Sequence, residues 1–176
     1  DKYGVLYLQR AEKLEDPKII FRAKNQLAYI LFNSGEYDQS FEIYQEMLEI
    51  AQIAKDSSNL KNVYNNLGGV SYEQNKDVEA LEYTLKSLAY AEPRSLNYYE
   101  GLYNVNAMKL HLDQMEGLED SFKRVLAFAR ERYEEDEKKG INFLTYTEHA
   151  LGFFYQMTGQ NDLARPYFDR SLEHAK

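Results

Sequence analysis

Three asparagines and a histidine recur at one position of a repeated pattern: Asn25, Asn65, Asn106 and His149. Each stands two residues before the first apolar residue of its repeat, which is Leu27, Leu67, Met108 or Leu151. A primary amide both donates and accepts hydrogen bonds, so it matches the N–H and C=O groups of an extended peptide backbone. The column therefore predicts a polar stripe that binds a polypeptide segment. The alternative is that asparagine is merely frequent here and tolerated on a solvated helix face.

The elements that carry this column are expected to be helices. Only three prolines and nine glycines interrupt 176 residues, while helix-forming residues abound. The first apolar residues of the four patterns are spaced by 40, 41 and 43 residues, which indicates a repeated unit. No run shows the alternation of apolar and polar residues that is typical of a strand.

Small residues within each repeat predict that it is a helical hairpin. Small residues let two helices approach closely. One column of them directly follows the first apolar residue, at Ala28, Gly68 and Gly152. A second column stands thirteen residues after that apolar residue, at Ser40, Ala80, Ser121 and Ala164. Gly35 and Gly159 stand where the first helix must end, because glycine adopts the left-handed C-terminal conformation without strain.

Turn signals between these patterns predict the element boundaries. Asp16-Pro17 is a cap followed by proline at the first helical position, and Gly140 is expected to separate the last two hairpins. We expect helices over residues 2–14, 17–33, 36–54, 57–74, 77–91, 95–114, 117–139, 141–158 and 161–175. The charged run 131–139 is expected to be an exposed helix end with ion pairs Glu134/Lys138 and Glu135/Lys139.

The repeat columns resemble the tetratricopeptide repeat (TPR) family, with close matches at 65–68, 35–37 and 80–83. The longer repeats of 40–43 residues are similar to those of kinesin light chain and of the peptide-pheromone receptors of Gram-positive bacteria. The resemblance implies an all-α, right-handed superhelical solenoid of antiparallel helix hairpins. We expect a single array over 1–176, with a partial repeat at 1–16 and repeats at about 17–56, 57–94, 95–140 and 141–176.

The resemblance also implies which positions face a ligand. In that family these positions lie on the first helix of each hairpin, and they map here to a polar surface with aromatic patches. The predicted peptide-binding residues are Arg22, Asn25, Tyr29, Asn62, Asn65, Tyr72, Tyr103, Asn106, Tyr146, His149 and Phe153. The family's carboxylate clamp binds the C-terminal acid of chaperone tails with lysine, asparagine and arginine. The matching positions here are Asn25, Tyr29, Asn66, Tyr103 and Ala107, so the clamp's cations are missing and we do not expect this chain to bind chaperone tails in that way. Arg22 alone could pair with an acidic ligand group.

Charge and composition exclude several function classes. The chain has 29 acidic and 21 basic residues, a net charge of −8, so direct nucleic-acid binding through this region is disfavoured. It has no cysteine, its three histidines are scattered, and no run of about 20 apolar residues could span a membrane. We predict no catalytic residues, no metal site, no cofactor and no membrane contact.

These observations predict a non-catalytic peptide- or protein-binding module in the cytoplasm. The chain begins at Asp1 without an initiator methionine, and we expect it to be a fragment of a larger protein. Our first hypothesis is the peptide-sensing part of a bacterial regulator, which holds an extended peptide in its concave groove. The second is a scaffold or oligomerisation segment of a multidomain signalling or transport-adaptor protein that binds folded partners or forms a homodimer.

Overall fold

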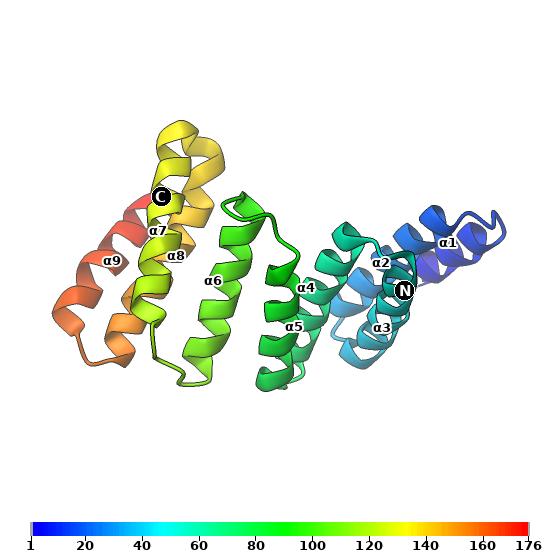
Figure 1. Cartoon of the computed structure of the whole chain (residues 1–176), viewed down its shortest axis with the longest axis horizontal. Helices are drawn as coiled ribbons and strands as arrows, with labels where there is room; N and C mark the ends of the chain where they lie inside the picture. Colours follow the sequence, from blue (N-terminus) through cyan, green and yellow to red (C-terminus); the bar gives the residue numbers. More distant parts are fainter. Residues whose placement is uncertain (1, 176) are drawn as a thin grey trace. The chain divides into compact units, whose positions relative to one another are not determined.

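The computed structural model describes residues 2–175, with side chains from Gly4 onward. Over this range the chain forms nine α-helices and no strand, which confirms the expected all-α class (Figure 1). The helices divide into two compact units, Asp1–Ala91 and Glu92–Lys176. Asp1 and Lys176, the outermost residues of the expected array, lie outside the described residues.

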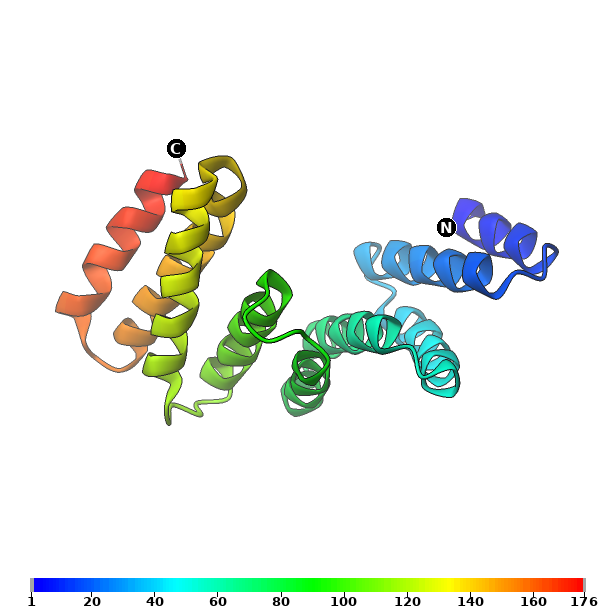
Figure 2. The same ribbon diagram turned by 45° about the horizontal axis from the view of Figure 1, so that its top comes forward.

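The first unit is a series of helices in which each packs against the next along the chain, seen from two directions in Figures 1 and 2. Its helices are α1 (Lys2–Glu12), α2 (Pro17–Asn33), α3 (Tyr37–Ala54), α4 (Ser57–Glu73) and α5 (Asp77–Ala89). The predicted start of α2 is confirmed, because Asp16 Oδ1 accepts a hydrogen bond from the Lys18 amide at 2.9 Å. The bounds of α2 are those expected from the sequence.

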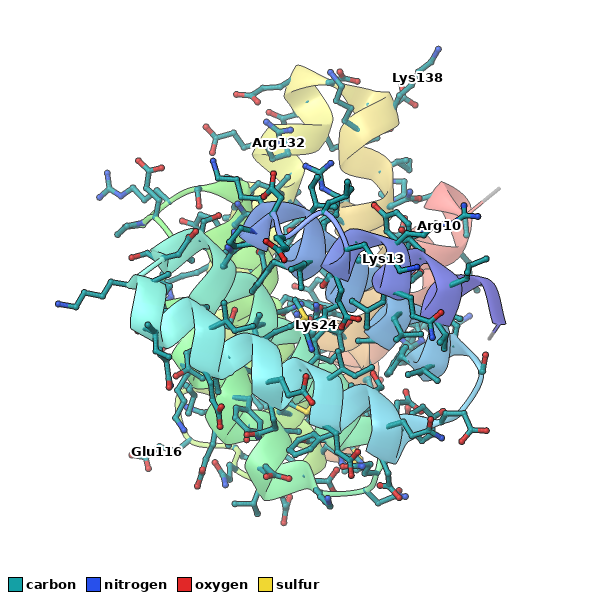
Figure 3. All side chains as sticks on the ribbon, turned by 90° about the vertical axis from the view of Figure 1, so that its right-hand side faces the viewer. Arg10, Lys13, Lys24, Glu116, Arg132 and Lys138 are labelled. Atoms are coloured by element: carbon teal, nitrogen blue, oxygen red, sulfur yellow. The ribbon has the colours of Figure 1, made fainter. Side chains whose placement is uncertain are left out.

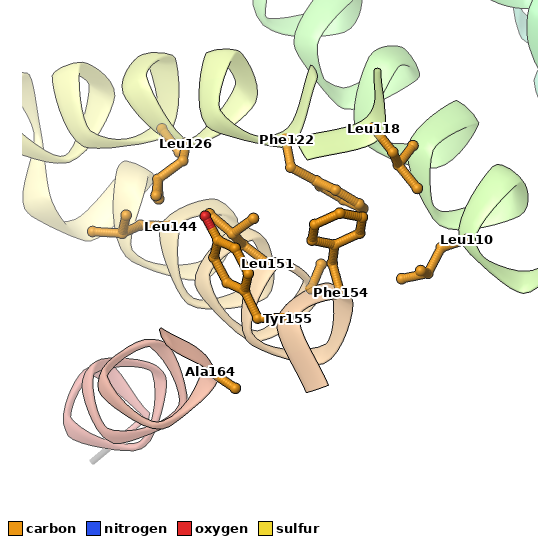
Figure 4. Packing of buried hydrophobic residues seen from close by; sticks show 11 residues of the cluster. Leu110, Leu118, Phe122, Leu126, Leu144, Leu151, Phe154, Tyr155 and Ala164 are labelled. Carbon is orange, nitrogen blue, oxygen red and sulfur yellow. The ribbon is translucent and has the colours of Figure 1, made fainter. Parts of the chain in front are cut away.

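The second unit contains α6 (Leu96–His111), α7 (Leu118–Glu135), α8 (Glu137–Met157) and α9 (Asn161–His174). Helix α8 packs against both α7 and α9, and α6 packs against α7. The core of this unit is shown in Figure 4, where Phe122 of α7 lies against Phe154 of α8 with ring centroids 6.2 Å apart. Both rings are buried, so they anchor the hairpins to each other by apolar contact.

The small residues do bring the helices of a hairpin close together. Ser40 of α3 is fully buried and its Oγ donates to the Ala28 carbonyl oxygen of α2 at 2.8 Å. A Cβ atom on Gly68 would lie 2.7 Å from Thr84 Oγ1, and one on Gly152 would lie 3.0 Å from the Phe168 ring. The expected packing role of this column is therefore confirmed.

The expected boundary between α7 and α8 is wrong. Helix α7 ends at Glu135, and Asp136 caps α8 by accepting a hydrogen bond from the Lys139 amide at 3.3 Å. Gly140 lies inside α8, at a point where α7 passes very close: a Cβ atom there would lie 2.4 Å from Tyr133 Cα. The glycine therefore permits close backbone approach and does not end a helix.

The charged run around this turn also pairs differently from our expectation. Lys139 Nζ lies 2.9 Å from Asp136 Oδ2, and Arg132 Nη1 lies 3.6 Å from Glu135 Oε2. Figure 3 shows Arg132 of α7 and Lys138 of α8 near the turn that joins these two helices. Because α7 stops at Glu135, the expected pairs across residues 134–139 are not carried on one continuous helix.

A buried carboxylate joins three helices of the second unit. Glu148 of α8 is 1% exposed, and its Oε1 accepts hydrogen bonds from Arg170 Nε of α9 at 2.9 Å and from Arg130 Nη2 of α7 at 3.5 Å. Its Oε2 lies 3.1 Å from Nδ1 of His174, also on α9. A buried charge needs such partners, so this cluster constrains how α9 packs on α7 and α8.

Candidate functional site

A polar cleft of about 550 Å³ lies between α2 and α4 in the first unit. Four of the predicted ligand-facing residues line it together, which are Arg22, Asn25, Asn62 and Asn65. The remaining lining residues are Lys18, Phe21, Asp56, Asn59, Val63 and Asn66. The structure thus brings the α2 and α4 parts of the predicted site onto one surface.

Hydrogen bonds inside the cleft determine which amides are available. Asn66 Nδ2 donates to Asn25 Oδ1 at 3.3 Å, which joins α4 to α2. Asn59 donates its backbone N–H and its Nδ2 to Asp56, at 3.0 and 2.9 Å. Asn62 and Asn65 are exposed and make no hydrogen bond to a side chain in the described part of the chain. These two amides can therefore bond a ligand without losing a protein partner.

Two predicted tyrosines of the first unit lie outside this lining. Tyr29 is 59% exposed on α2, and Tyr72 is 40% exposed on α4. Tyr29 lies close enough to the buried Tyr44 of α3 to influence it: burial, and then Tyr29, raises the pKa of Tyr44 to about 12. A ligand role for Tyr29 and Tyr72 stays a prediction.

The predicted residues of the second unit form a different, aromatic surface. Tyr146 and Phe153 of α8 are 59% and 43% exposed. Half-buried Tyr103 of α6 packs edge to face with Phe143 at 6.2 Å, and burial, with Tyr146 nearby, raises the pKa of Tyr103. His149 is exposed, although its ring packs against Phe168 at 5.4 Å. This face offers stacking surfaces where the α2–α4 cleft offers amides.

Asn106 does not belong to the exposed column, and its predicted place there is wrong. It is 2% exposed, and its Oδ1 accepts a hydrogen bond from Ser121 Oγ of α7 at 2.8 Å. It therefore occupies the interhelical position that Ala28, Gly68 and Gly152 fill in the other hairpins.

The cause of this error is a longer turn. Helices α6 and α7 are joined by residues 112–117, whereas α2 and α3 are joined by residues 34–36 alone. The three additional residues shift the third repeat by three positions. The residue that corresponds to Asn25 and Asn65 is consequently Tyr103, so the column reads Asn25, Asn65, Tyr103 and His149.

Sequence reasoning missed two polar residues of the cleft, Lys18 and Asn59. The signal was present in their spacing. Lys18 precedes Arg22 by four residues and Asn59 precedes Asn62 by three, so each shares a helix face with a residue that was predicted. Both lie one helical turn nearer the start of their helix than the family's ligand-facing positions.

The described residues 2–175 hold no group of three or more histidine, aspartate or glutamate side chains that could bind a metal ion. Within the same range, no helix combines the length and apolar character that a bilayer crossing requires. Glu148, the buried carboxylate of the second unit, is held by two arginines and is not among the residues that line the α2–α4 cleft.

Comparison with known proteins confirms the resemblance expected from the repeats. Residues 20–92 match the tetratricopeptide repeat model. The chain is 28% identical over 141 residues to the transcriptional activator NprA of Geobacillus stearothermophilus, an alignment that covers 79% of this chain and 33% of NprA. The chain thus spans about a third of the length of this relative.

Solved structures share the helical-solenoid fold. BtubC (BKLC) from P. vanneervenii superposes with a TM-score of 0.84 at 22% identity, over 99% of this chain and 72% of that one. A putative kinesin light chain from Podosopora anserina superposes with a TM-score of 0.72 at 15% identity, over 98% of this chain and 91% of that one. NprR in complex with its cognate peptide NprX superposes with a TM-score of 0.70 at 18% identity, over 96% of this chain and 47% of that one. At these identities the likeness shows the fold alone, and it confirms the expected fold class.

Proposed function

We propose that this chain is a non-catalytic peptide-binding module, the peptide-sensing part of a bacterial regulator, and that an extended peptide lies in the α2–α4 cleft. The observation that carries the proposal is the lining of this cleft, in which asparagine amides from two successive hairpins face one space. The similarity to NprA, a transcriptional activator, and to the peptide complex of NprR supports the same assignment.

The amides suit a peptide main chain because each can donate and accept. Asn62 and Asn65 lie on one face of α4, and a bound strand would present N–H and C=O groups to both. Each such bond contributes about 1 kcal/mol net, so two bonds alone give weak binding. Phe21 and Val63, which also line the cleft, supply apolar surface for ligand side chains.

The proposal includes a cytoplasmic location and no direct contact of this region with nucleic acid or membrane. The net charge of −8 supports the second point, because long-range repulsion opposes binding to phosphate backbones and anionic lipids. The regulatory output then belongs to parts of the protein outside this chain.

The test is a selection from a random linear peptide library displayed on phage, followed by calorimetry on synthetic versions of the selected peptides. We expect peptides that bind the full chain and lose about tenfold or more in affinity for the Asn62→Ala/Asn65→Ala variant, since two hydrogen bonds are removed. The matched control is Asn97→Ala/Asn161→Ala, which removes two exposed amides from the second unit. Equal losses of peptide affinity in the two variants would contradict the proposal that the peptide binds in the α2–α4 cleft.

A second candidate is a scaffold that binds a folded partner or a second copy of itself. Exposed apolar side chains favour it: Val78 and Leu85 on α5 are 63% and 43% exposed, and Leu163 and Leu172 on α9 are 49% and 65% exposed. Static light scattering without added peptide separates the two candidates. A self-associating scaffold gives a mass that rises with protein concentration, whereas the peptide module gives a constant monomer mass.

A further inference from the structure

Two unpartnered polar atoms face each other inside the second unit. Four buried side-chain atoms of the described residues have no hydrogen-bond partner, and two of them are Glu148 Oε2 and His174 Nδ1. These two atoms lie only 3.1 Å apart, on α8 and α9. A buried polar atom without a partner costs free energy, so one proton bonded between the two would relieve both defects.

The rest of the cluster leaves this gap to His174. Arg170 Nε and Arg130 Nη2 both donate to Oε1 of Glu148, at 2.9 and 3.5 Å, and Oε2 accepts no hydrogen bond from a described residue. A neutral imidazole carries one N–H, and when that hydrogen is on Nε2 the lone pair of Nδ1 is turned toward the carboxylate. A protonated imidazole carries an N–H on both nitrogens. Protonation of His174 therefore supplies the donor that Oε2 lacks.

The charges around His174 oppose one another, and burial decides between them. Glu148 attracts a proton on His174, whereas Arg130 and Arg170 repel it. The side chain of Glu148 is 1% exposed, while those of Arg130 and Arg170 are 48% and 38% exposed. Solvent and salt screen exposed charges more strongly than buried ones, so the attraction outweighs the repulsion.

The remaining charged groups near the ring of His174 are acidic. The ring of Tyr133 on α7 lies 5.5 Å from the ring of His174, and its hydroxyl donates to Glu137 Oε1 of α8 at 3.3 Å. Glu173 directly precedes His174 on α9. Both glutamates are exposed, so their attraction for a proton on His174 is weak, and it has the same sign as that of Glu148.

We propose that His174 is a proton-dependent lock that holds α9 against α7 and α8, more tightly in mildly acidic than in mildly alkaline conditions. The folded state takes up the proton between His174 and Glu148. Its contribution to stability is therefore present below the pH range in which histidine titrates, and it is lost as the pH rises through that range. Phe168 of α9 contacts the ring of His149 at 5.4 Å, so loosening of α9 also disturbs the aromatic surface of the second unit. The inference goes beyond peptide binding and does not depend on it.

The test is hydrogen–deuterium exchange of the full chain at pH 6 and pH 8, with each rate divided by the intrinsic rate at that pH. Relative to the amides of α4, we expect the amides of α9 to be protected about three- to tenfold more at pH 6 than at pH 8. His174→Gln keeps a polar side chain but cannot take up a proton, so its α9 should be equally protected at both pH values. His111→Gln, at an exposed histidine on α6, is the matched control and should keep the pH dependence.

A second measurement needs no substitution and decides the question if His174→Gln does not fold. In the nitrogen-15-labelled wild type at pH 6, NMR should show an Nδ1–H signal of His174, because a buried and hydrogen-bonded proton exchanges slowly with water. The signal should be lost at pH 8.

Three outcomes would overturn the lock. The first is equal protection of α9 at the two pH values in the wild type. The second is a pH dependence that survives in His174→Gln, because another group would then produce it. The third is an Nδ1–H signal that persists unchanged at pH 8, since the neutral imidazole of His174 would then already donate to Glu148.

Discussion

Ser121 Oγ of α7 donates a hydrogen bond of 2.8 Å to Oδ1 of Asn106 on α6, at an interhelical position where the other hairpins carry alanine or glycine. The second polar atom of this side chain, Nδ2, is buried and has no hydrogen-bond partner in the described residues. An unsatisfied buried donor costs free energy, so this asparagine weakens the contact it occupies.

Asn106→Ala should therefore change the free energy of unfolding by less than about 1 kcal/mol, or raise it. The substitution removes one hydrogen bond and one unsatisfied donor, and Ser121 can turn to a backbone carbonyl as Ser40 does. Asn106→Leu should lower the free energy of unfolding by about 1–3 kcal/mol, because the larger branched side chain overpacks the interface. Urea unfolding measures both. A loss above about 2 kcal/mol in Asn106→Ala would show that the hydrogen bond dominates.

Arg170→Met should lower the free energy of unfolding by about 2 kcal/mol, because it leaves the buried Glu148 carboxylate with only the longer bond to Arg130 and the contact with His174. Arg165→Met is the control on the same helix, since the Arg165 side chain is 85% exposed and its Nε lies 3.9 Å from Asp169 Oδ2. It should change stability by less than about 0.5 kcal/mol.

The double variant Glu148→Met/Arg170→Met tests the reason for this effect. Once the buried charge is removed, the loss caused by Arg170→Met should be largely recovered. Thermal unfolding of the single and double variants gives the coupling energy. If the double variant loses as much stability as the sum of the two single variants, the buried charge of Glu148 is not the cause of the loss in Arg170→Met.

Gly140→Ala should lower the free energy of unfolding by about 2 kcal/mol or more, because its Cβ would lie 2.4 Å from Tyr133 Cα and the backbone of α7 would have to move. Gly69→Ala in α4 is the matched substitution, since nothing lies within 4 Å of the added atom. It should stabilise the protein by about 0.5–1 kcal/mol through the better helix propensity of alanine. Opposite signs in a thermal shift assay support this view of Gly140, and equal shifts contradict it.

Stability at high pH should depend on Tyr44. Burial, and then the nearby Tyr29, raises the pKa of Tyr44 from 10.0 to about 12, so the folded state holds this proton more tightly than the unfolded chain. The contribution is fully present below pH 10 and is lost as the pH rises through about 12. Urea unfolding between these pH values should show a shallower decline for Tyr44→Phe than for the wild type. Tyr146→Phe, at an exposed position, is the control, and equal slopes for the two variants would reject the prediction.

The hairpins could be predicted from the sequence because their signals are local. The cap at Asp16 and the small residues at Ala28 and Ser40 report contacts that recur in each repeat, and α2 was predicted to its exact bounds. The role of Gly140 cannot be read from the sequence, because a glycine that permits close helix approach looks the same there as one that ends a helix. Only the position of Tyr133 distinguishes the two.

The candidate site could be predicted only in part. The α2 and α4 residues share a register, so their positions transferred correctly between repeats and four of them meet in one cleft. The positions of the third repeat did not transfer, because the turn between α6 and α7 is longer than the turns within the first two hairpins. A signal was present in the sequence: Lys109 directly follows the apolar Met108, whereas the other three repeats carry the small residues Ala28, Gly68 and Gly152 at that place. Lys18 and Asn59 were missed because their role depends on how far the cleft extends along both helices.

The hydrogen bond from Asn66 to Asn25 joins side chains 41 residues apart, on helices that belong to successive hairpins. A peptide that contacts α2 and α4 at once would limit the fluctuations of one hairpin against the next. The loss of conformational entropy in the protein would then offset part of the binding free energy, without any change in average structure. A second ligand that needs the same ordered arrangement would meet a smaller entropic penalty, so two binding events on this unit would be coupled through motion alone.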